Sequence, residues 1–204
     1  FSTIEIGSDY ELARQTLGVS LLDSMYLYPY NIIVEGPSDE IMLKGAWEKL
    51  HEDKRTKIDP VNIRFFPGNG ASGACTLYES LITFGDSDEV KICLIIDGDD
   101  AGDKALRGLI KRLMPSRPLY GNKNYFQLTK ATEWLVSGRV MSKISKQYPA
   151  QITLKRNVKE EITDFIIHDG KKKKIAKKVI DTSEIEDLSE FKDLIKSIEK
   201  ELLA

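Results

Sequence analysis

The chain has 204 residues, of which 41% are hydrophobic and 30% charged, as is typical of a globular domain of ordinary size. It contains no apolar run of the roughly 20 residues that a membrane helix needs, and its first residues do not resemble a signal sequence. A formal net charge of −2 excludes a uniformly basic nucleic-acid binder, and two cysteines argue against a disulfide framework or zinc knuckle. We therefore expect a cytoplasmic domain, and the start at Phe1 indicates a piece of a longer chain.

Helices and strands are predicted to alternate through the first two thirds of the chain. In chain order, the spacing of apolar residues predicts a helix at 10–26, a strand at 31–34, a helix at 39–51, a strand at 61–66, a helix at 74–84, a strand at 90–96, a helix around 106–113 and a strand at 125–128. Residues 90–96 are the most continuously apolar, which favours a central strand buried on both faces. This alternation predicts an α/β fold with a parallel sheet of about four strands flanked by helices.

The last third of the chain is predicted to be a helical extension. Its expected helices cover 130–141, 159–168, 172–179 and 188–202. Ser183 and Glu186 have the spacing of a capping box near the start of the last helix. We expect a core at 30–130 and an extension at 131–204 that completes the domain, with 1–29 as a helical connector.

Acidic residues follow two of the predicted strands. Glu35 and Asp39 come after the first strand, and Asp97 and Asp99 come after the buried one. Singly, either motif could be a helix cap or a turn. Ligand sites of parallel sheets, however, lie beyond the carboxyl ends of the strands, where the strand order reverses. If the first and third strands are neighbours, Glu35 and Asp97 lie about 5 Å apart.

Four carboxylates in one crevice repel one another, and burial adds to the free-energy cost of keeping them charged. A divalent cation relieves this repulsion directly. Oxygen ligands from Asp and Glu suit Mg²⁺ or Mn²⁺ better than zinc. A hard cation held by a few carboxylates, with open positions for water and phosphate, is typical of a phosphoryl-transfer site.

The sequences VEGPSD at 34–39 and IDGDDAG at 96–102 resemble the Toprim pattern, which topoisomerases, bacterial primases, recombination proteins and OLD (overcoming lysogenization defect) nucleases share. Three further segments resemble the OLD branch: LGVSLLDS at 17–24, PGNGA at 67–71 and ATEWL at 131–135. The resemblance implies a Toprim-like sheet and a metal-dependent DNA endonuclease with a role in phage defence. It also implies that 1–29 connects to an N-terminal ATPase part, where any ATP would bind.

The resemblance implies a set of site residues. Metal ligands that also act in catalysis would be Glu35, Asp39, Asp97, Asp99 and Glu133, and a late lysine would assist from 172–174, with Lys173 and Lys174 as the candidates. Trp134 departs from the pattern, because the family commonly has a second acid there. Two Mg²⁺ or Mn²⁺ ions would activate the attacking water and stabilise the leaving 3′ oxygen. The implied partners are DNA, the ATPase part of the same chain and a helicase-like protein, and a homodimer stays open.

Other functions compete with this interpretation. The run Gly68-Asn-Gly-Ala-Ser-Gly73 is a literal G-x-G-x-x-G between a strand and a helix, which could bind a dinucleotide with Asp97 on its ribose. A Toprim protein of the primase or topoisomerase type is a second alternative, and a structural cation in a domain that only recruits a partner is a third. No G-x-x-x-x-G-K-[ST] motif occurs, so ATP hydrolysis is not expected within these residues.

Overall fold

The structure, a computed structural model, describes residues 28–84, 91–114, 116–159, 161–168 and 170–204. The predicted helix at 10–26 and the connector at 1–29, except for its last two residues, lie outside this part of the chain. The first elements are β1 (Tyr30–Val34), α3 (Pro37–Glu52), β2 (Ile63–Pro67), α4 (Ala71–Phe84), β3 (Lys91–Ile96), α5 (Asp100–Leu113) and β4 (Tyr125–Gln127). Strand and helix alternate as predicted, although α4 begins at Ala71, three residues earlier than expected.

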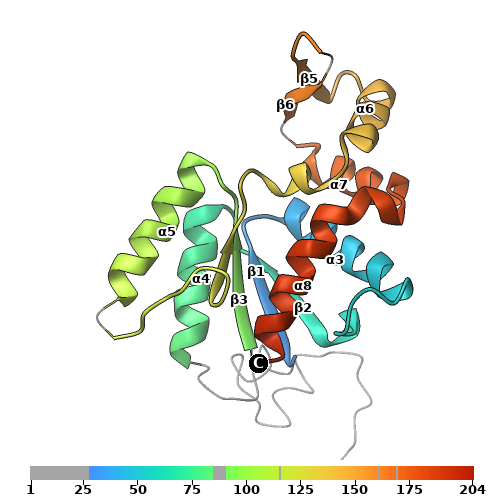
Figure 1. The fold of residues 1–204 in the computed structure, drawn as a ribbon. Coiled ribbons are helices and arrows are strands. Elements are labelled where there is room, and N and C mark those ends of the chain that lie inside the picture. Colours follow the sequence, from blue (N-terminus) through green and yellow to red (C-terminus); the bar gives the residue numbers. More distant parts are fainter. Residues whose placement is uncertain (1–27, 85–90, 115, 160, 169) are drawn as a thin grey trace, which may run out of the picture.

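The four strands form one sheet in the order β2-β1-β3-β4, and every pair is parallel. This confirms the predicted α/β class and the predicted parallel sheet of about four strands. The chain moves from β1 outward to β2 and then returns to β3 on the other side of β1 (Figure 1). The order therefore reverses between β1 and β3, and a crevice is expected at the carboxyl ends of these two strands.

Both faces of the sheet are covered by helices, because alternate residues of each strand point to opposite sides. Ile32 and Val34 belong to the apolar cluster that contains residues of α3 and the C-terminal helices. Ile33, together with Leu94 and Ile96 of β3, belongs to the cluster under α4 and α5. The predicted central strand is thus buried on both faces. Among the described helices, none combines the length and apolarity needed to cross a membrane.

The last third of the chain differs from the predicted run of helices. It contains a short 3₁₀ helix η2 (Thr132–Leu135), α6 (Gly138–Gln147), β5 (Ile152–Arg156), β6 (Ile162–Ile167), α7 (Lys172–Thr182), a short 3₁₀ helix η3 (Ile185–Leu188) and α8 (Ser189–Leu202). The predicted helix at 130–141 is wrong as one element, because Val136 and Ser137 adopt extended backbone angles and separate η2 from α6. The predicted helices at 172–179 and 188–202 are confirmed as α7 and α8.

The predicted helix at 159–168 is also wrong, because residues 162–167 form a strand. This strand, β6, pairs antiparallel with β5 in a two-stranded hairpin. Ile162, Phe165 and Ile166 have spacings that a helix also produces, but β-branched and aromatic residues favour an extended strand. A cross-strand ion pair, in which Lys155 Nζ lies 2.8 Å from Asp164 Oδ2, accompanies the pairing.

The predicted capping box is displaced by one residue. Glu184 N–H donates to Asp187 Oδ2 over 3.0 Å, so the box surrounds η3 and uses Glu184 and Asp187. Ser183, the predicted cap, instead donates its hydroxyl to the carbonyl of Val179 over 2.8 Å at the end of α7. The hydroxyl has therefore turned back to the preceding helix, an interaction that sequence spacing alone does not distinguish from a cap.

Close packing of α3 on α7 predicts an unequal response to two glycine substitutions. A Cβ at Gly45 of α3 would lie 2.6 Å from Ile180 Cγ2 of α7, so we expect Gly45→Ala to lower the free energy of unfolding by about 1–3 kcal/mol. A Cβ at Gly108 of α5 meets only Arg112 Nη1, at 3.5 Å, so Gly108→Ala should be neutral or stabilising. Urea unfolding of both variants measures the difference. Equal effects would show that α7 does not pack on α3 as described.

Candidate functional site

The ends of β1 and β3 bring together two acids that lie far apart in the sequence. Glu35 follows β1, and Asp97 follows β3, its neighbour in the sheet. Asp97 N–H donates to Glu35 Oε1 over 2.9 Å, across 62 positions of sequence. The prediction that the first and third strands are neighbours, with these acids side by side, is therefore confirmed. The pair lies at the reversal point of the strand order, where parallel sheets bind their ligands.

Asp39 and Asp99 enter the same region from the first turns of two helices. Asp39 is only 6% exposed, and its Oδ2 accepts from Gly36 N–H over 2.7 Å at the start of α3. Asp99 is the N-cap of α5, where its Oδ1 accepts from Gly102 N–H over 2.7 Å. Each carboxylate thus caps a helix and also lines the crevice, so a capping role does not exclude either residue from a site.

Glu133 completes the acidic group from η2, and its neighbour Thr132 holds Asp97 by hydrogen bonds. Glu133 is 7% exposed. Thr132, which the sequence analysis did not select, donates both its backbone N–H and its hydroxyl to Asp97 Oδ1, over 3.0 and 3.2 Å. These two bonds fix the orientation of Asp97. The sequence held no signal for Thr132, since its role depends on how the loop after β4 returns to β3.

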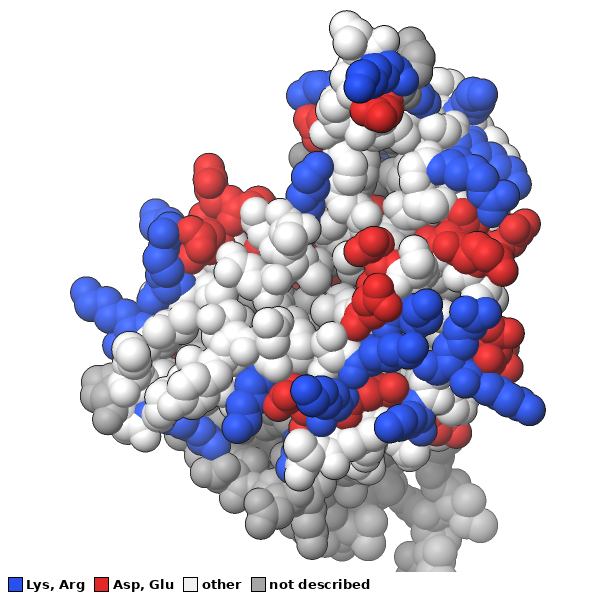
Figure 2. Space-filling model, in the orientation of Figure 1, with Lys and Arg blue, Asp and Glu red and all other residues white. Residues whose placement is uncertain are grey.

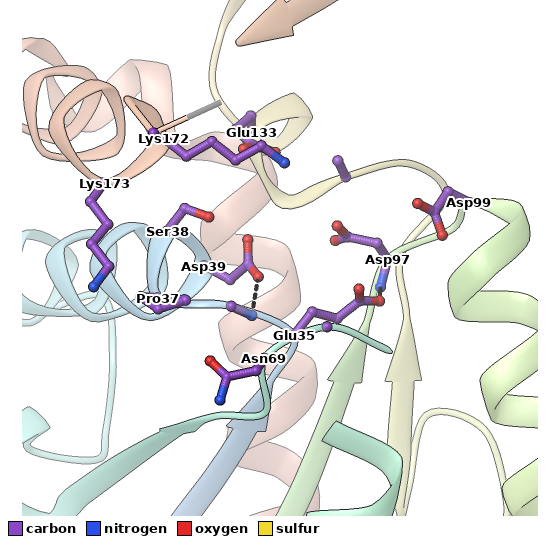
Figure 3. A pocket seen from close by; sticks show the side chains of 14 residues that line it. Glu35, Pro37, Ser38, Asp39, Asn69, Asp97, Asp99, Glu133, Lys172 and Lys173 are labelled. Carbon is purple, nitrogen blue, oxygen red and sulfur yellow. Dashed lines mark hydrogen bonds between the residues drawn. The ribbon is translucent and has the colours of Figure 1, made fainter. Parts of the chain in front are cut away.

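These side chains line one cavity of about 510 Å³, a volume within the range of small-ligand sites. Figure 3 shows the carboxylates entering it from the strand ends and from α3. The lining consists of Glu35, Gly36, Pro37, Ser38, Asp39, Asn69, Gly70, Asp97, Asp99, Ala131, Glu133, Gly170, Lys172 and Lys173. All five predicted metal ligands are among them. The cavity therefore unites acids from β1, α3, β3, α5 and η2.

The lysines that reach the cavity differ from the predicted pair. Lys172 and Lys173 line it, whereas Lys174 lies outside, with its Nζ 5.3 Å from the ring centroid of Tyr148. Figure 3 shows Lys172 extending from α7 over the cavity toward Glu133, while Lys173 runs toward Pro37. Lys172 precedes buried Ile175 and Ala176 by three and four positions, so it shares their face of the helix. This position on the buried face of α7 favours Lys172 over Lys174 as the lysine that reaches the cavity.

Burial and mutual repulsion make the carboxylates hard to ionise. Burial, followed by the charge of Glu133, raises the pKa of Asp39 to about 7. Burial, followed by the charges of Asp39, Glu35 and Glu133, raises the pKa of Asp97 to about 8. The pKa of Glu35 is also raised, chiefly by burial, although the Asp97 N–H and the positive charge of Lys172 oppose the shift. Such a cluster gains stability from any bound positive charge.

The donor set fits a hard divalent cation. The cavity offers five carboxylates and, among its described lining residues, neither histidine nor cysteine, which suits Mg²⁺ or Mn²⁺. Within the described part of the chain, no three acidic, histidine or cysteine side chains already meet in the arrangement of a bound ion. Four of the carboxylates each direct one oxygen to a backbone N–H instead. Ion binding would therefore use the remaining oxygens or require small side-chain rotations.

The raised pKa values predict that the ion-free domain loses stability as the pH rises. Asp39 and Asp97 are protonated in the folded state up to about pH 7 and 8, but in the unfolded chain only below about 4. Their contribution is thus complete below about pH 4 and is lost as the pH rises from there to 7–8. Between pH 5.5 and 8.5 in EDTA, we expect the free energy of unfolding to fall by on the order of 5 kcal/mol.

Asp97→Asn should flatten this pH profile, because asparagine carries no proton that the rising pH removes. Its amide oxygen can still accept both bonds from Thr132. Thermal unfolding of both proteins in EDTA across the pH range gives the comparison. A wild-type profile that is level, or that rises toward pH 8.5, would contradict the repulsion described here.

The glycine loop, the G-x-G-x-x-G run at 68–73, does not lie where a dinucleotide-binding fingerprint would lie. It follows β2, which is an edge strand, and Gly70 adopts φ +102 while its N–H donates to the Glu35 carbonyl over 2.7 Å. A Cβ at Gly73 would lie 1.8 Å from the Gly68 carbonyl oxygen, so this glycine permits a close approach of backbone. The loop thus supports the turn that contains Glu35. Its Asn69 and Gly70 line the acidic cavity, whose carboxylates would repel an unaccompanied pyrophosphate.

The fold and the cavity together define a class: a doubly wound parallel α/β domain with an acidic ligand crevice at the reversal of its strand order. Comparisons with protein-family models, curated proteins and solved structures found no match.

Proposed function

We propose that this domain is a metal-dependent nuclease of the Toprim type, from an OLD-family protein, that hydrolyses phosphodiester bonds of DNA. The observation that supports this best is the meeting of Glu35 and Asp97 at adjoining strand ends, with three more carboxylates in one cavity. A cluster of acids with raised pKa values at a ligand crevice is costly unless it serves a site. The resemblance of 34–39 and 96–102 to the Toprim pattern supplies the reaction.

Each residue then has a role that its position allows. Glu35, Asp39, Asp97, Asp99 and Glu133 would hold one or two Mg²⁺ or Mn²⁺ ions. Thr132 keeps Asp97 in place through two hydrogen bonds, and Lys172, with Lys173, offsets negative charge on the phosphate. When bound, divalent ions of this kind lower the pKa of a coordinated water and neutralise charge on the reacting phosphate.

The charge distribution also supports a polyanionic substrate. The basic segment, defined as residues 138–178, holds 12 Lys and Arg against 4 Asp and Glu, a formal charge of +8 in a chain whose total is −2. Its α7 begins beside the acidic cavity with Lys172 and Lys173. DNA would thus be attracted by this segment while its phosphate meets the carboxylates through metal ions.

Supercoiled plasmid DNA tests the proposal. The wild-type domain should convert it to nicked or linear forms with Mn²⁺ or Mg²⁺, and EDTA should stop the reaction. For substitutions of the acids in the cavity, the matched control is Asp100→Asn. Asp100 is exposed in the first turn of α5 and is not among the residues that line the cavity. This control should retain full activity. A domain that binds Mn²⁺ and plasmid but never cleaves would favour a structural cation instead.

A further inference from the structure

A second cavity adjoins the acidic one. It has a volume of about 420 Å³ and lies between the loop that contains η2 and the strand β6 of the hairpin. Asp99, Ala131, Glu133 and Lys172 line both cavities, so the two lie side by side. A polynucleotide whose phosphate occupies the acidic cavity would therefore place a neighbouring nucleotide in the second one.

Two partly exposed aromatic rings form one wall of this second cavity. The ring centroids of Trp134 and Phe165 lie 4.7 Å apart, with planes inclined by 30°. Nζ of the exposed Lys130 lies 3.6 Å from the Trp134 centroid, so a face of this ring attracts a cation. Trp134 is also the position at which the chain departs from the acid expected there. We call Trp134 and Phe165 the ring pair.

The surroundings of the ring pair favour a polyanion. β6 and the rest of the hairpin belong to the basic segment, with its formal charge of +8. Figure 2 shows Lys and Arg side chains gathered over the hairpin and α6, at the top of the view. Nucleic-acid strands are typically held in this way, by positive charge along the backbone and by aromatic rings against the bases.

We infer that the ring pair stacks an unpaired base next to the phosphate in the acidic cavity, so that the preferred substrate is single-stranded or locally unpaired DNA. This inference rests on the proposed function. The base takes the place of the Lys130 ammonium on the Trp134 ring, and the freed lysine turns to a phosphate. Bases inside a duplex are already stacked on each other, so intact duplex would gain nothing from the rings.

Intrinsic fluorescence provides a direct test, because the chain has two tryptophans in opposite environments. Trp47 is 0% exposed and donates its Nε1–H to the Ile58 carbonyl over 3.1 Å, so it should not respond to a ligand. With Ca²⁺ in place of Mg²⁺ or Mn²⁺, a single-stranded oligonucleotide of about 12 bases should quench Trp134 saturably. Trp134→Phe should remove the quenching and weaken binding by less than about threefold, since phenylalanine also stacks.

Substitutions that remove a ring test the contribution of stacking. Trp134→Ala should raise the dissociation constant about 5- to 150-fold, corresponding to the stacking energy of one base, and Phe165→Ala, which removes the ring packed against Trp134, should have a smaller effect in the same direction. The control is Tyr120→Ala, because Tyr120 is 58% exposed on the loop before β4 and should not change binding. Thermal unfolding of each variant identifies any loss of fold, and Trp134→Phe keeps the test valid if the alanine variants unfold.

An abasic oligonucleotide of the same length separates stacking from charge. It should bind at least about fivefold more weakly and leave the fluorescence unchanged. Equal quenching by the abasic strand, or equal binding by Trp134→Ala and Tyr120→Ala, would overturn the inference. Because quenching reports binding and not hydrolysis, it is read independently of cleavage. Quenching without plasmid cleavage would reject the proposed function alone, and cleavage without quenching would reject the ring pair alone.

Discussion

Asp97→Asn should reduce Mn²⁺-dependent cleavage of plasmid DNA at least about 1,000-fold, a loss of about 4 kcal/mol in transition-state stabilisation. Burial, followed by the charges of Asp39, Glu35 and Glu133, raises the pKa of Asp97 to about 8, above the value of about 7 for Asp39. An amide retains its shape and its bonds to Thr132 but removes the negative charge that would hold an ion.

The same substitution should leave the fold intact. Asparagine relieves repulsion in the cavity, so we expect the ion-free variant to unfold at the wild-type temperature or above it at pH 8. Initial rates over a range of Mn²⁺ concentrations, with Asp100→Asn in parallel, give the comparison. Full Mn²⁺-dependent activity in Asp97→Asn would show that this carboxylate holds no essential ion.

Lys172→Ala should lower the cleavage rate about 100-fold, comparable with the loss of one charge-stabilising donor from an enzyme site. Lys172 lines both the acidic cavity and the second cavity, and its positive charge opposes the rise in the pKa of Glu35. Lys172→Arg preserves the charge and should recover part of the rate. The effect should fall on kcat, because the lysine would offset charge that develops during the reaction.

Lys174→Ala is the matched control for this experiment. Lys174 is equally exposed and only two positions away, but its ammonium lies over Tyr148 instead of in the cavity. We expect it to retain at least about one third of the wild-type rate, since a surface charge outside the site contributes little. A larger loss in Lys174→Ala than in Lys172→Ala would reverse the assignment that the register of α7 supports.

Sequence alone was sufficient for the sheet and for most of the acidic cavity. The apolar run at 91–96 must be buried on both faces, which makes it central and places Asp97 at a carboxyl end. Glu35 then follows by the same rule. These inferences succeed because they depend on local patterns and on the limited geometry of parallel sheets.

The hairpin and Thr132 could not be found in this way. Whether 162–167 becomes helix or strand depends on pairing with β5, a contact that the spacing of Ile162 and Phe165 does not encode. The bonds from Thr132 to Asp97 depend on the path of the loop after β4. Contacts between residues far apart in the sequence, rather than residue type, decide both the strand and the hydrogen bonds. The same holds for the ring pair, whose members are 31 positions apart.

Crystals soaked in Mn²⁺ provide the most direct measurement of the central claim, because anomalous scattering locates the ion without reference to activity. We expect a peak within about 2–2.3 Å of carboxylate oxygens from both Glu35 and Asp97. Absence of the peak at concentrations that saturate plasmid cleavage, or a peak bound elsewhere while both side chains keep their backbone hydrogen bonds, would contradict it.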